Sequence, residues 1–95
     1  MNNKKLTIAV IGLGFGCEFA PIYAAHPNVD RVILVDNNLA NATRALEKCK
    51  RFTNRTSIAD SFSAVLSDST VDAVHVCTGI PSHAELTIEI GRAHV

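Results

Sequence analysis

Residues 6–18 read L-T-I-A-V-I-G-L-G-F-G-C-E, and this stretch decides the fold of the 95-residue chain. Its apolar first half, Leu6–Ile11, suits a strand buried on both faces. Three alternating glycines follow, Gly12, Gly14 and Gly16, and then a stretch compatible with a helix. Glycines in such a turn let backbone N–H groups approach a phosphate, and the N-terminus of the next helix attracts its charge. The sequence therefore predicts a nucleotide-binding turn.

The rest of the chain alternates apolar runs with helical stretches. We predict further strands over residues 30–36, 56–59 and 71–77. We predict helices over residues 15–25, 39–50 and 62–66 and a last one from His83, after a turn at residues 78–82. Strands and helices that alternate at this spacing form βαβ units with right-handed crossovers. The expected fold is therefore an α/β domain with a parallel sheet of about four strands and helices on both faces.

The first predicted helix carries large apolar side chains on one side. Phe15, Phe19, Ile22 and Tyr23 recur at i, i+4, i+7 and i+8. This spacing is typical of a helix face that packs against a sheet, so we expect these four side chains to be covered.

The glycines fit the dinucleotide-binding pattern G-x-G-x-x-G/A, which is followed by an acidic residue about 20 positions on. Gly12 and Gly14 match, and the small Cys17 takes the third position, which serves close packing of helix on strand. Asp36 follows Gly14 by 22 residues and ends the second predicted strand. Its carboxylate can accept both hydroxyls of an adenosine ribose and would repel a 2′-phosphate. Only asparagines follow it, beginning with Asn37, so the sequence predicts NAD as the cofactor and makes NADP the less favoured one.

Each of these residues also has a purely structural interpretation. The glycines could simply make a tight turn between strand and helix, and Asp36 could be a helix N-cap. His83 follows the fourth predicted strand, where open α/β sheets bind ligands, but a helix-start histidine without a function is equally compatible. His75 lies within an apolar strand, and we expect it to be a residue of the sheet face rather than a catalyst.

Composition and cysteine spacing exclude several classes of protein. The formal net charge is zero, which favours neither nucleic acid nor a membrane surface as a partner. No apolar stretch approaches the roughly 20 residues that span a bilayer. Cys17, Cys49 and Cys77 are odd in number and have the spacing of neither a disulfide framework nor a zinc site. We therefore expect free thiols, no metal site and a cytoplasmic location.

Taken together, these motifs resemble the N-terminal domain of the Gfo/Idh/MocA family (glucose–fructose oxidoreductase, inositol dehydrogenase and related proteins). The resemblance is carried by G-L-G-F-G-C-E-F-A-P-I-Y from Gly12, V-D at 35–36, V-L-S-D-S-T-V-D-A-V-H-V from Val65 and C-T-G-I-P-S-H from Cys77. It runs over residues 6–89. It implies a Rossmann-type sheet and an NAD-dependent oxidoreductase that acts on a small molecule, such as a sugar or polyol.

The resemblance also implies roles for individual residues. The pyrophosphate would be bound by Gly12, Leu13, Gly14, Phe15, Gly16 and Cys17. Asp36 with Asn37 would hold the adenine ribose. Thr78, Gly79 and His83 would lie near the nicotinamide, matching the family's T-P-x-x-x-H element, although Gly79 stands where that element usually has proline.

The family's catalytic residues have no counterpart in this chain. Its lysine lies in an E-K-P segment after the last matching helix, and its other catalytic groups lie on a separate substrate domain. We therefore interpret residues 1–89 as a partial dinucleotide-binding domain, inactive alone, of a longer and homo-oligomeric protein. Residues 90–95, I-G-R-A-H-V, also read as the translation of a common sequencing adapter, so we expect a non-native tail there.

Two other functions fit parts of the pattern. An S-adenosylmethionine-dependent methyltransferase also has G-x-G-x-G after a strand. Members of that class resemble one another in an acidic residue two positions before the first glycine, and this chain has Val10 there. A non-catalytic dinucleotide sensor would keep the binding domain and lack the lysine. The sequence downstream of residue 89 would discriminate between sensor and enzyme.

Overall fold

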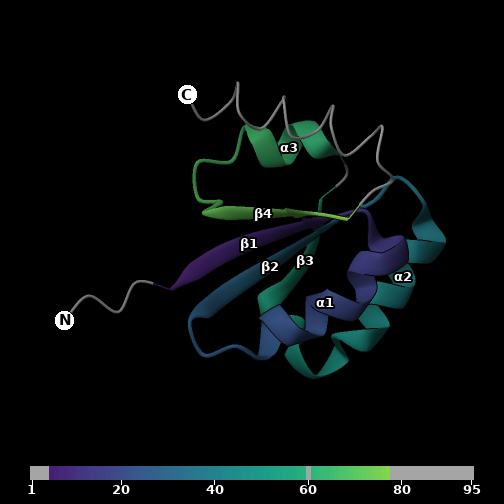
Figure 1. Ribbon diagram of the computed structural model, residues 1–95, viewed down its shortest axis with the longest axis horizontal. Helices are drawn as coiled ribbons and strands as arrows, with labels where there is room; N and C mark the ends of the chain where they lie inside the picture. Colours follow the sequence, from purple (N-terminus) through teal and green to yellow (C-terminus); the bar gives the residue numbers. More distant parts are fainter. Residues whose placement is uncertain (1–4, 60, 78–95) are drawn as a thin grey trace.

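The computed structural model describes residues 5–59 and 61–77, which form one four-stranded sheet with helices on both of its faces (Figure 1). The elements in chain order are β1 (Leu6–Ile11), α1 (Leu13–Ala25), β2 (Val29–Val35), α2 (Leu39–Lys48), a 3-10 segment η1 (Lys50–Arg55), β3 (Thr56–Ala59), α3 (Phe62–Leu66) and β4 (Ala73–Val76). The strand order is β3-β2-β1-β4, and every pair is parallel. The turn and helix expected after residue 77, and the tail at 90–95, lie outside the described residues.

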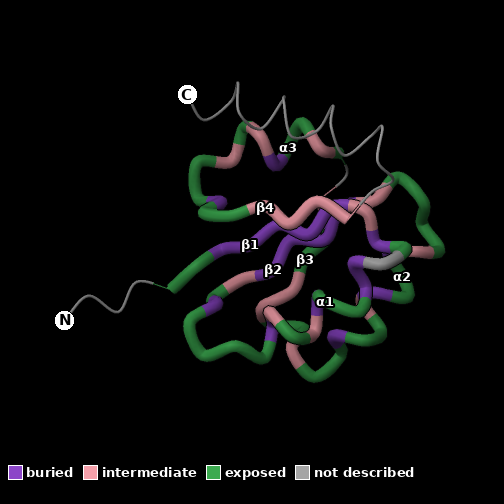
Figure 2. Tube along the Cα trace, viewed as in Figure 1, coloured by how far each residue is buried: buried purple, intermediate pink, exposed green. Residues whose placement is uncertain are grey.

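The two central strands are apolar on both sides because helices cover both faces of the sheet. Ile8, Val10, Val32 and Leu34 point to the face covered by α1 and α2. Their neighbours along β1 and β2 point to the other face, where Val65 of α3 packs. Figure 2 shows the resulting buried centre along β1 and β2. This all-parallel sheet confirms the predicted Rossmann-type α/β fold, in an incomplete form. Among the described residues, no helix is long and apolar enough to cross a membrane.

The face of α1 that packs on the sheet differs from the predicted one. Phe19 and Ile22 are 41% and 63% exposed, so the expectation of a covered face is wrong for these two, whereas the half-buried Tyr23 packs against the core. The side chain of Phe15 is not among those described. The buried positions of α1 are instead occupied mostly by small residues: Leu13, Cys17, Ala20 and Ala24.

Small residues occupy this face because α1 lies very close to β1. A Cβ added to Gly16 would lie 2.7 Å from Cγ1 of Val10. Carbon atoms do not approach so closely, so residue 16 has to be glycine for α1 to keep this position. The close approach that the sequence pattern assigns to position 17 therefore occurs at Gly16, and the buried Cys17 packs beside it.

The second helix begins as the sequence predicts and ends slightly earlier. Asn38 is its N-cap, and its side-chain oxygen accepts hydrogen bonds from the amides of Ala40 and Asn41 at 2.9 and 3.3 Å. Such a cap stabilises a helix by about 1 kcal/mol. The helix ends at Lys48, whose ammonium lies 3.1 Å from the carboxylate of Glu18 on α1.

A Gly16→Ala substitution should lower the free energy of unfolding by about 1–2 kcal/mol. The added methyl overlaps a stiff, fully buried valine, which outweighs the gain in helix propensity. Urea denaturation of the full chain measures the change. Gly14→Ala is the matched control, because nothing lies within 4 Å of its added Cβ. Equal stability of the two variants would contradict the close packing.

Candidate functional site

The glycine turn lies where the order of the strands changes direction. The chain passes from β1 to β2 on one side, whereas β4 pairs with β1 on the other side. In open parallel sheets, ligands bind at such a switch point, outside the carboxyl ends of the strands. The turn after β1 therefore occupies the position in the fold at which a ligand is expected.

Gly12 gives the turn its shape. Its backbone is left-handed, with φ 87° and ψ 88°, a conformation that side chains disfavour. Its N–H donates to the carbonyl of Val35 at 3.0 Å, which joins the turn to the end of β2. The turn is thus anchored to the neighbouring strand by the backbone itself.

The start of α1 presents backbone donors that the helix does not use. The first bond within the helix runs from the amide of Gly16 to the carbonyl of Gly12 at 3.0 Å. The amides of Gly14 and Phe15 therefore have no acceptor within the helix. The position next to Gly14 is open, because an added Cβ would meet nothing within 4 Å. Two N–H groups beside open space at a helix N-terminus can bind an anion.

Asp36 lies beside this turn and is held from three directions. Its Oδ2 accepts from the amide of Leu13 at 2.8 Å and from the side-chain amide of Asn41 at 3.2 Å. Its Oδ1 accepts from the amide of Asn38 at 2.8 Å. Asn38, rather than Asp36, is the N-cap of α2, so the alternative interpretation of Asp36 as that cap does not hold. The carboxylate instead links the end of β2 to the first residue of α1.

The three contacts leave Asp36 some capacity for a ligand. An ionised carboxylate can accept about four hydrogen bonds. One position therefore stays available, and the longest contact, that of Asn41, is the easiest to exchange. The carboxylate is oriented before any ligand binds.

The remaining predicted site residues have different surroundings. Asn37 is exposed in the loop between β2 and α2. Cys17 is 2% exposed, with its Sγ 3.7 Å from the carbonyl of Gly14, so its side chain belongs to the core. Thr78, Gly79 and His83 lie outside the described residues.

His75 is a residue of the sheet face, as expected, and it contacts α1. The register of β4 pairs it with Val10, which places it on the side that α1 covers. Its Nδ1 lies 2.7 Å from the hydroxyl of Tyr23, and its ring lies 4.9 Å from that of Phe19. Burial raises the pKa of Tyr23, and the nearby thiol of Cys77 adds to the effect. Sequence reasoning missed the pair, because 52 positions separate its members.

Two residues of α2 extend the contacts of Asp36 and were also missed. Arg44 donates to the side-chain oxygen of Asn41 at 2.8 Å, and Asn41 in turn donates to Asp36. Residues three apart on a helix are neighbours, so the spacing allowed the contact between Asn41 and Arg44, but it did not indicate that Asn41 reaches Asp36.

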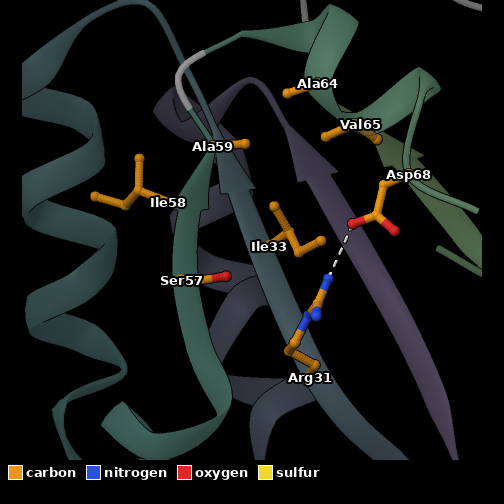
Figure 3. Close-up of a pocket in the computed structure, with 8 residues that line it drawn as sticks. All are labelled: Arg31, Ile33, Ser57, Ile58, Ala59, Ala64, Val65 and Asp68. Atoms are coloured by element: carbon orange, nitrogen blue, oxygen red, sulfur yellow. Dashed lines mark hydrogen bonds and ion pairs between the residues drawn. The ribbon is translucent and has the colours of Figure 1, made fainter. Parts of the chain in front are cut away.

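A separate hollow of about 250 Å³ lies on the α3 side of the sheet (Figure 3). In this view Arg31 and Asp68 point toward each other, with a nitrogen–oxygen distance of 3.1 Å. Hydrogen bonds from Thr70 lower the pKa of Asp68, and Arg31 adds to the effect. No residue of the glycine turn is among the described residues that line this hollow. The hollow is therefore separate from the candidate site, which we place at the turn because of its open backbone donors and the neighbouring Asp36.

The cysteines behave as structural residues. All three are free, and Cys17 and Cys49 are buried. Burial raises the pKa of both Cys49 and Cys77, which disfavours the reactive thiolate. Within residues 5–59 and 61–77, no three His, Cys, Asp or Glu side chains gather as a metal site would require.

Comparison with known proteins agrees with this fold. A family model described as an oxidoreductase family with an NAD-binding Rossmann fold matches residues 6–95. A search of curated proteins finds no match. Among solved structures, the chain is similar to a protein from Desulfitobacterium hafniense that is described, by inference, as an NADPH-dependent oxidoreductase. The TM-score is 0.78 at 19% identity, over 98% of this chain and 25% of that one. The likeness shows a shared fold, and the chain spans a quarter of that protein's length.

Alkylation should distinguish structural thiols from reactive ones. At pH 8 the raised pKa values keep Cys49 and Cys77 more protonated in the folded chain than in the unfolded chain. Iodoacetamide should therefore modify both more slowly in buffer than in 8 M urea, and Cys49 should be the slower because it is fully buried. Peptide mass spectrometry follows each site. Modification of folded Cys49 at the unfolded rate would contradict a structural role.

Proposed function

Since the chain belongs to the Gfo/Idh/MocA family of oxidoreductases, we propose that its glycine turn binds the pyrophosphate of a nicotinamide dinucleotide. One observation supports this most directly. The amides of Gly14 and Phe15 have no acceptor within α1, and they adjoin open space where Gly14 lacks a side chain. A pyrophosphate in that space would accept both hydrogen bonds and lie at the positive end of the helix dipole.

Asp36 would hold the adenine ribose of the same cofactor. Its carboxylate lies one hydrogen bond from Leu13, the residue before Gly14, and therefore at the edge of the proposed pyrophosphate position. A ribose diol has two hydroxyl donors. One would use the remaining acceptor position of Asp36, and the other would replace the 3.2 Å contact from Asn41. The negative charge of Asp36 favours NAD(H) over NADP(H), whose 2′-phosphate it repels.

The activity of the longer protein follows from this binding role. The nicotinamide supplies hydride transfer, and the residues of this chain bind and orient it. We infer a dehydrogenase that acts on a sugar, a polyol or a related metabolite, with its catalytic residues outside this chain. The free cysteines support a cytoplasmic location, and the family resemblance supports a homo-oligomer. The family match does not favour the methyltransferase alternative. A dinucleotide sensor would bind NADH equally but show no turnover in the longer protein.

A Gly14→Ala substitution should weaken NADH binding by tenfold or more. The added methyl would enter the open space that the pyrophosphate needs, whereas the folded chain has room for it. Fluorescence titration of NADH measures the dissociation constant, and urea denaturation checks that stability is kept. Wild-type affinity in a stably folded Gly14→Ala variant would rule out this position for the pyrophosphate.

An Asp36→Asn substitution should weaken NADH binding about tenfold and NADPH binding less, so that the difference between the two cofactors narrows. The neutral amide keeps the shape of the side chain but loses charge-assisted hydrogen bonds to the ribose. Asp30→Asn, at the opposite end of β2, is the control and should change neither affinity. Equal affinities of the wild-type chain for NADH and NADPH would contradict the role given to Asp36.

A further inference from the structure

The hollow on the α3 side of the sheet exists because small side chains face it from two elements. Ala59 lies on β3 and Ala64 on α3, and both line the hollow (Figure 3). Ile33 of β2 and Val65 of α3 complete the apolar part of its lining. Its volume of about 250 Å³ gives room for about eight non-hydrogen atoms, if each takes the roughly 30 Å³ of a water molecule in the liquid. The hollow therefore suits a small molecule with a compact apolar part.

The polar side of the hollow comes from two neighbouring strands. The register of the sheet pairs Ser57 of β3 with Ile33 of β2. Arg31 lies two positions before Ile33 and therefore on the same face of the sheet. In Figure 3 the hydroxyl of Ser57 points toward β2, beside which Arg31 extends. Arg31 and Ser57 thus line the same hollow from adjacent strands.

Two hydrogen-bond donors on this polar side have no partner within residues 5–59 and 61–77. The Nε of Arg31 is buried and makes no hydrogen bond. The hydroxyl of Ser57 also bonds to no group in the described part of the chain. A buried donor without an acceptor lowers the stability of a folded protein, and few such donors occur in native structures. An oxygen atom of a ligand in the hollow would supply the acceptor that Arg31 lacks.

The charges beside the hollow balance one another. Nη2 of Arg31 donates to Oδ2 of Asp68 at 3.1 Å and to the hydroxyl of Thr70 at 3.4 Å. The amide of Thr70 donates to Oδ1 of Asp68 at 2.9 Å, so both oxygens of this carboxylate are already held. A charged ligand would be repelled by one member of the pair of Arg31 and Asp68, whereas an uncharged ligand would not. The lining therefore favours an uncharged molecule.

We propose that this hollow is a second binding site, separate from the glycine turn, for a small uncharged molecule with a carbonyl oxygen and a compact apolar part. The carbonyl oxygen has two lone pairs and accepts from the donors of Arg31 and Ser57. The apolar part leaves water and packs against the aliphatic lining. Because no described residue of the glycine turn lines the hollow, this site does not depend on the proposed dinucleotide binding.

The test is an NMR titration of the full chain with cyclopentanone, a small uncharged ketone. We expect the Nε–H signal of Arg31 to shift saturably, with a dissociation constant of about 1–10 mM. Ser57→Ala should weaken binding about threefold, because it removes one of the two donors. Ala64→Leu should abolish binding, since it fills the hollow from an exposed position on α3. Ala25→Leu makes the same change at an exposed position of α1, on the other face of the sheet, and should leave binding unchanged.

Each outcome decides for or against the site. Saturable binding that is lost in Ala64→Leu and kept in Ala25→Leu supports it. A shift that does not saturate, or that is the same in both variants, would show adventitious contact only and overturn the proposal. Tighter binding of acetate than of cyclopentanone would overturn the uncharged class of ligand. Should Ala64→Leu fail to fold, as judged by circular dichroism, the loss of affinity in Ser57→Ala decides in its place. A titration with NADH tests the glycine turn separately, because its signals are those of Gly14 and its neighbours.

Discussion

The hydrogen bond between the carboxylate of Asp36 and the amide of Leu13 joins the two parts of the proposed site. Leu13 begins α1, and Asp36 follows β2, so this 2.8 Å contact links the start of the helix to the end of the strand, 23 positions apart in sequence. A second link runs in parallel, from the amide of Gly12 to the carbonyl of Val35. Together they place the helix terminus and the acidic side chain at one edge of the sheet. A dinucleotide needs both at once, because its pyrophosphate and its ribose are covalently joined.

The position of α1 depends on how closely that helix approaches β1. Gly16 permits the contact with Val10, and the small residues Cys17, Ala20 and Ala24 continue it along the helix. A larger side chain at any of these positions would push α1 away from the sheet. The amides at its N-terminus would then move with it. The close packing of α1 on β1 therefore also fixes the position of the backbone amides at the N-terminus of α1.

The fold, and the arrangement that places the glycine turn beside Asp36, were predictable from the sequence because their signals are local. The strand Leu6–Ile11 and the glycines after it are contiguous, and Asp36 follows at a spacing fixed by one helix and one strand. The covered face of α1 was not predictable from side-chain size. Large apolar residues such as Ile22 satisfy a hydrophobic pattern, whereas the close helix–strand distance selects small ones.

The contacts that sequence reasoning missed depend on three-dimensional register. The pair of Tyr23 and His75 forms only because β4 aligns His75 with Val10, beneath α1. The link from Arg44 through Asn41 depends on side-chain direction along α2, and no spacing rule for dinucleotide sites includes it.

The left-handed Gly12 has a consequence for the thermodynamics of ligand binding. Its conformation is set by its place between β1 and α1 and by the bond to Val35, so the turn is ordered as soon as the sheet forms. The loss of conformational entropy in these residues, on the order of 1–2 kcal/mol for each, is incurred during folding and not during association. A dinucleotide bound at this turn would therefore meet a preformed backbone, and the affinity it gains from each hydrogen bond would not be reduced by the ordering of a flexible loop.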